Sequence, residues 1–80
     1  MSKAIIEAIR EAIEQRIPES SAEVSTGAGP GHYNVTVRAG AFVGKPMVQA
    51  HRMVYAAISH LMDGDRPAVH AIDLLRALAP

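Results

Sequence analysis

A predicted helix between two predicted strands is the feature that most constrains how this chain folds. Residues 46–62 open with Pro46, which suits the first turn of a helix, and one side of the segment is apolar. That side consists of Met47, Ala50, Val54, Ala57, Ile58 and Leu61. Residues 32–38 alternate strictly between apolar and polar side chains and residues 68–75 form an apolar run, so both are predicted strands. Strands joined by a helix within one sheet pair in parallel through a right-handed crossover.

The rest of the chain supplies another helix and another strand. Residues 2–17 carry isoleucines at four-residue spacing, and Pro18 ends this amphipathic helix. Residues 22–25 are a short strand candidate, and residues 26–31 form a loop because their glycines and proline fit neither periodic element. We therefore expect an α+β fold in the order helix, strand, strand, helix, strand, with both helices on one face of a three-stranded sheet. Residues 1–80 are expected to form a single domain.

Size and composition narrow the classes of function. A chain of 80 residues buries only about 60% of its unfolded surface, so a closed active-site cavity is not expected and the protein is predicted not to be an enzyme. Eight basic and eight acidic residues give zero formal charge, so no overall field attracts nucleic acid or an anionic membrane. The sequence has no cysteine, which excludes disulfide and thiolate chemistry, and its apolar runs are too short for a spanning helix or a signal peptide. A cytoplasmic location is the expectation.

The four histidines are the residues best suited to metal chemistry, because imidazole is a good ligand for iron, zinc or copper. His32 opens the strand at residues 32–38, and His70 lies near the start of the strand at residues 68–75. Parallel strands that flank a crossover helix start at the same end of the sheet. The two imidazoles are therefore predicted to converge at one rim of the sheet, beside the glycine loop.

Each of these histidines also has a plainer explanation. His70 is predicted to share a strand face with Ile72 and Leu74, and by spacing alone a half-buried histidine bonded to the backbone is favoured over a ligand. His32 is equally well explained as a polar residue at the end of a strand. A small interaction module whose histidines bind nothing is thus one hypothesis.

Three short motifs occur in the order and spacing typical of one family. They are F-x-G-K at Phe42, Gly44 and Lys45, H-R-x-V-Y at His51, Arg52, Val54 and Tyr55, and V-H-A at Val69, His70 and Ala71. With these motifs the chain resembles the BolA family over most of its length, which implies a KH-like fold of the type II order. Ala50 stands where the family usually has the first arginine of R-H-R, and relatives commonly continue into another helix after the position of Pro80.

The resemblance implies a function in iron-sulfur cluster assembly and stress response. A BolA-like protein pairs with a monothiol glutaredoxin and helps to hold, transfer or regulate a 2Fe-2S cluster that glutathione also binds. On this basis His70 is the expected metal ligand. The family's second ligand is a Cys or His in the loop before the strand, and this loop offers His32 at its end. The free protein is expected to hold no cluster tightly and to be a monomer or a weak homodimer.

The alternative function is that of a KH-like nucleic-acid-binding transcriptional regulator. Arg38, Lys45 and Arg52 would then have to lie on one continuous face. A KH domain grips the nucleic-acid backbone with a G-x-x-G loop, and the glycines of this chain do not supply that motif. Only weak binding of DNA is therefore expected.

Overall fold

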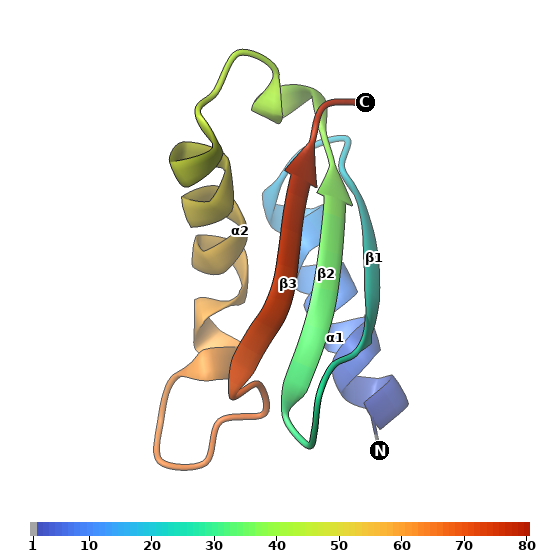
Figure 1. Ribbon diagram of the computed structural model, residues 1–80, viewed down its shortest axis with the longest axis vertical. Coiled ribbons are helices and arrows are strands. Elements are labelled where there is room, and N and C mark those ends of the chain that lie inside the picture. Colours follow the sequence, from blue (N-terminus) through green and yellow to red (C-terminus); the bar gives the residue numbers. More distant parts are fainter. Residues whose placement is uncertain (1) are drawn as a thin grey trace.

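Two helices and three strands account for most of the chain in the computed structural model, which describes residues 2–80. The chain forms α1 (Ser2–Arg16), β1 (Ser21–Thr26), β2 (His32–Arg38), a short 3-10 turn (Gly40–Phe42), α2 (Met47–Met62) and β3 (Ala71–Leu78), as Figure 1 shows. The predicted order of helix, strand, strand, helix and strand is confirmed. Within residues 2–80, no helix has the length and apolar character needed to cross a membrane.

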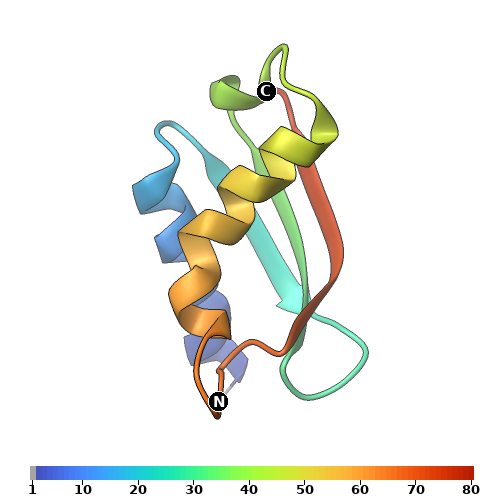
Figure 2. The same ribbon diagram turned by 90° about the vertical axis from the view of Figure 1, so that its left-hand side faces the viewer.

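Strand β2 lies in the middle of the sheet. It pairs antiparallel with β1 and parallel with β3, so the strand order is β1-β2-β3. The parallel pair is joined through α2, as predicted from the strand–helix–strand pattern. Both helices cover the same face of the sheet, which Figure 2 shows from the side. The parallel pairing fixes the starts of β2 and β3 at one end of the sheet, called here the sheet rim.

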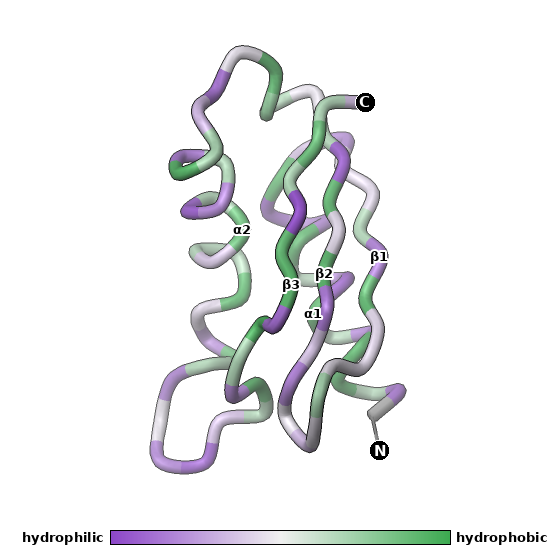
Figure 3. The backbone as a smooth tube through the Cα atoms, in the orientation of Figure 1, coloured by the Kyte–Doolittle hydropathy of each residue, from purple (hydrophilic) through white to green (hydrophobic). Residues whose placement is uncertain are grey.

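The core lies between the helices and this covered face. Its largest fully buried side chains are Ile9, Ile13, Ile17, Val35, Val37, Val54, Ile58 and Val69. Burial of each such aliphatic side chain contributes about 1.5–3 kcal/mol to folding. Hydropathy changes sign repeatedly along the helices and β2, as expected of elements with one buried side (Figure 3). The predicted apolar stripe of α2 is correct at Ala50, Val54 and Ala57, which are all buried.

Met47 is the exception on this helix. It was predicted to belong to the apolar stripe, but 71% of it is exposed. Met47 is the first residue of α2 and lines an open groove with Phe42 and Leu78 instead of entering the core. The stripe therefore begins one turn later, at Ala50.

Strand β3 differs from its predicted range of residues 68–75. The amide of Val69 donates to the carbonyl of Leu61 at 3.0 Å, and the amide of His70 donates to the carbonyl of Gly31 at 2.8 Å. These contacts tie the segment to the end of α2 and to the glycine loop before regular pairing starts at Ala71. At the other end, pairing continues as far as Leu78, which lies opposite Arg38.

A bulge in β3 also changes which side chains share a face. Tyr33 lies opposite Ile72 and Asn34 lies opposite Leu74, so Asp73 is an extra residue between them. The extra residue reverses the alternation, and Leu74 is 51% exposed. The prediction that His70, Ile72 and Leu74 share one strand face is therefore wrong.

Candidate functional site

His32 and His70 lie at the sheet rim. His32 is the first residue of β2 and pairs with Ala71, the first residue of β3, so His70 directly precedes the partner of His32. Their backbones therefore meet at one end of the sheet, as the parallel pairing predicted. His70 is exposed, and the side chain of His32 is 38% exposed. Both imidazoles are accessible to a partner, and whether they bind a metal stays a prediction.

The glycine loop at residues 27–31 is fastened to the start of both strands. The amide of Gly27 donates to the carbonyl of His32 at 2.7 Å, and the amide of His32 donates to the carbonyl of Gly29 at 3.0 Å. The carbonyl of Gly31 accepts from the amides of His70 at 2.8 Å and of Ala71 at 3.2 Å. These bonds satisfy backbone groups that the sheet ladder does not reach.

Gly31 leaves room for the ring of His70. Its φ of +78° lies in the left-handed region, which favours glycine. A Cβ atom added at Gly31 would lie only 2.7 Å from Cγ of His70. The imidazole of His70 therefore packs against the bare Cα of the residue that directly precedes His32.

Asp73 is a member of this site that the sequence did not reveal. Its Oδ1 lies 2.8 Å from Nδ1 of His32, and its Oδ2 accepts from the amide of Ala28 at 2.7 Å. Hydrogen bonds from His32 and from Ala28 lower the pKa of the Asp73 carboxyl. Gly27 accommodates the carboxylate, because a Cβ atom there would lie 2.5 Å from Oδ2 of Asp73. The only sequence signal was a single Asp inside an apolar run.

The donor set fits a shared metal centre better than a self-contained one. Among residues 2–80, no three His, Cys, Asp or Glu side chains are arranged to hold a metal ion. The Oδ1 atom of Asp73 already contacts Nδ1 of His32. The groups at the sheet rim that remain able to bind a metal are therefore the imidazoles of His32 and His70. A 2Fe-2S cluster needs four ligands, and sites with two imidazoles and two thiolates are an established type. The thiolates would have to come from a partner, because the chain has no cysteine.

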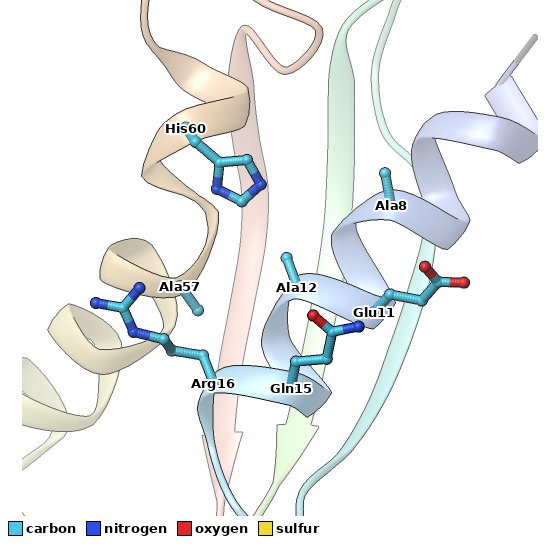
Figure 4. Close-up of a pocket in the computed structure, with 7 residues that line it drawn as sticks. All are labelled: Ala8, Glu11, Ala12, Gln15, Arg16, Ala57 and His60. Atoms are coloured by element: carbon cyan, nitrogen blue, oxygen red, sulfur yellow. The ribbon is translucent and has the colours of Figure 1, made fainter.

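The other two histidines lie on α2, away from this pair. His60 is exposed and lines a groove of about 480 Å³ between α1 and α2, together with Glu11, Gln15 and Arg16. Figure 4 shows the His60 ring pointing from α2 toward α1, with the small side chains Ala12 and Ala57 lower in the view and Ala8 across the groove on α1. His51 is half-buried and lines a different groove, beside β3.

The basic candidates are only partly brought together. Lys45 lines the groove of about 300 Å³ beside β3, and its basic neighbour there is Arg76, which the sequence did not single out. Arg38 is exposed at the end of β2, and Arg52 is exposed on α2. Neither is among the residues that line this groove. A single basic face formed by Arg38, Lys45 and Arg52 stays a prediction.

The fold and the sheet rim define a small α+β domain with an exposed pair of histidines beside a glycine loop. The sequence profile of the family described as BolA-like protein matches residues 3–80, so this chain belongs to the BolA-like family. The family resemblance inferred from the three motifs is confirmed.

Solved structures agree with this assignment. A bolA protein homologue from Coxiella burnetii has 27% sequence identity and a TM-score of 0.74, over 92% of this chain and 88% of that one. BolA1 from Mus musculus has 32% identity and a TM-score of 0.74, over 95% of this chain and 65% of that one. The BolA domain of SufE1 from Arabidopsis thaliana has 27% identity and a TM-score of 0.76, over 96% and 93%. No curated protein sequence matches the chain.

Proposed function

We propose that this BolA-like protein is a non-enzymatic partner of a monothiol glutaredoxin, and that it helps to hold, transfer or regulate a 2Fe-2S cluster. His70 and His32 would offer imidazole ligands, while the glutaredoxin and glutathione would supply thiolates. The observation that carries this function is the position of two accessible histidines at the same sheet rim, in a BolA-like chain without cysteine.

The chemistry of the pair suits a cluster that is passed on or sensed. Replacement of thiolate by neutral imidazole reduces the negative charge on the cluster and raises its reduction potential, as in Rieske centres. Exposure of His70 leaves its ring open to a partner surface. Two imidazoles supply only two of the four terminal ligands that a 2Fe-2S cluster needs, so the free protein should hold no cluster tightly.

The test is reconstitution of the cluster with and without a monothiol glutaredoxin and glutathione, followed by visible absorption and circular dichroism. The mixture should give a spectrum distinct from that of the glutaredoxin alone, and His70→Ala should abolish or strongly change it. His60→Ala is the matched control, because His60 lies in the groove between the helices. His32→Ala should affect cluster stability more than His60→Ala does. A mixture whose spectrum is the same with and without this protein would contradict the function.

One observation favours nucleic-acid binding as a second candidate function. Lys45 and Arg76 line one groove beside His51, and a phosphate group would be attracted to two cations there. The overall charge of zero limits this attraction, so we expect such binding to be weak.

A further inference from the structure

The bulge in β3 places a carboxylate where it controls one of the two candidate ligands. Asp73 is the extra residue between the pairs Tyr33–Ile72 and Asn34–Leu74. It has no pairing partner in β2, so its side chain does not follow the regular alternation of side chains between the two faces of the sheet. Its Oδ1 meets Nδ1 of His32 at 2.8 Å, and its Oδ2 is held by the amide of Ala28 at 2.7 Å. The carboxylate is thus fixed at both oxygens.

This contact determines where the proton of a neutral His32 lies. An ionised carboxylate only accepts hydrogen bonds, so Nδ1 of His32 must carry the hydrogen of the contact. The other ring nitrogen, Nε2, then keeps its lone pair and is the atom able to bind a metal. A carboxylate behind a metal-binding imidazole fixes its tautomer and orientation and raises its basicity.

The two histidines of the rim differ in this respect. The ring of His70 packs against Gly31, and no ring hydrogen bond of His70 is formed within residues 2–80. The tautomer of His70 is therefore left open in the free protein, while that of His32 is set in advance. His70 serves as an internal comparison for His32.

We infer that Asp73 is a positioning residue for metal binding by His32: it holds the imidazole as the Nδ1–H tautomer, presents Nε2 as the ligand atom and anchors the glycine loop through Ala28. The identity of the bound metal group rests on the proposed function. The tautomer of His32, in contrast, is a property of the free protein and can be measured without a cluster. The pair His32–Asp73 thereby identifies His32 as the prearranged ligand of the two.

The first test uses the free protein and nuclear magnetic resonance of the ring nitrogens, at a pH high enough for neutral histidine. His32 should be in the Nδ1–H form in the wild type, and Asp73→Asn should shift it toward a mixture of tautomers. Asp65→Asn is the matched control, because it removes the same charge from an exposed residue in a different loop. Backbone amide spectra establish that both variants are folded. A His32 that is protonated on Nε2 in the wild type, or unchanged by Asp73→Asn, would overturn the inference.

The second test follows loss of the cluster from the glutaredoxin complex to a chelator. Removal of a carboxylate behind a metal ligand typically weakens metal binding about 10- to 100-fold, so Asp73→Asn should speed cluster loss by a similar factor. Asp65→Asn should leave the rate unchanged. If the Asp73→Asn complex forms normally and loses its cluster at the wild-type rate, the role inferred for Asp73 is contradicted, while the proposed function is not. Failure of the wild-type mixture to form any shared cluster, with the predicted tautomer present, would instead contradict the proposed function.

Discussion

At the scale of single residues, the sheet rim depends on glycines whose missing side chains leave space for functional ones. Gly27 makes room for the carboxylate of Asp73, and Gly31 makes room for the ring of His70. The sequence predicted a loop from these glycines, but it did not indicate which side chains would occupy the space. That information depends on contacts between residues far apart in the chain, such as Ala28 with Asp73.

Gly31→Ala should destabilise the protein and displace His70. A left-handed conformation costs a residue with a side chain about 1–2 kcal/mol, and the added Cβ would also collide with the imidazole. Urea denaturation measures the loss of stability, and the ring resonances of His70 report the displacement. Gly29→Ala is the control, since a Cβ there meets no atom within 4 Å. Equal effects of the two substitutions would show that the close contact between Gly31 and His70 is absent in solution.

At the scale of elements, the sequence predicts helices more accurately than the last strand. Residues 46–62 and 32–38 were predicted to be helix and strand, and the observed elements are Met47–Met62 and His32–Arg38. Helical spacing and strict alternation are local signals, so they can be read from the sequence without knowing which elements pack against the helix or the strand. The ends and the bulge of β3 are set by pairing with β2 and by hydrogen bonds to Gly31 and Leu61. No local pattern in an apolar run contains that information.

The bulge can be tested by a matched pair of substitutions in β3. Because Leu74 is exposed, Leu74→Ala should change the free energy of unfolding by no more than about 0.5 kcal/mol. Leu75 is packed against the core, so Leu75→Ala should cost about 2 kcal/mol. Urea denaturation of both variants measures the difference. A larger cost at Leu74 than at Leu75 would mean that the alternation continues without a bulge.

At the scale of the whole molecule, zero net charge means that no overall field attracts nucleic acid, and a chain of 80 residues has only a small core. The fold class and the parallel arrangement of β2 and β3 were predictable, and with them the common location of His32 and His70. The role of Asp73 could not be predicted from the sequence, because its position in the site arises from the bulge in β3. Arg76 was missed for a related reason, since its neighbourhood with Lys45 depends on the packing of α2 beside β3.

The charge balance predicts only weak binding of DNA. We expect a dissociation constant no tighter than about 10⁻⁵ M at physiological salt, because nonspecific affinity comes mainly from neutralised phosphates. Fluorescence anisotropy with a labelled duplex, repeated at several salt concentrations, measures it. Submicromolar binding that is lost in Arg52→Ala would instead favour the regulatory function, with Lys45→Ala and Arg38→Ala as further tests of a common basic face.

The most direct measurement of the central claim is pulsed electron paramagnetic resonance of the reduced glutaredoxin complex, prepared with this protein labelled with ¹⁵N in its histidines. Nitrogen atoms bound to iron give strong hyperfine couplings that unbound histidines do not. We predict ¹⁵N couplings from two imidazoles in the wild type, loss of one set in His70→Ala and no change in His60→Ala. A reduced cluster without ¹⁵N coupling, or couplings that are unchanged by His70→Ala, would contradict ligation by the sheet rim.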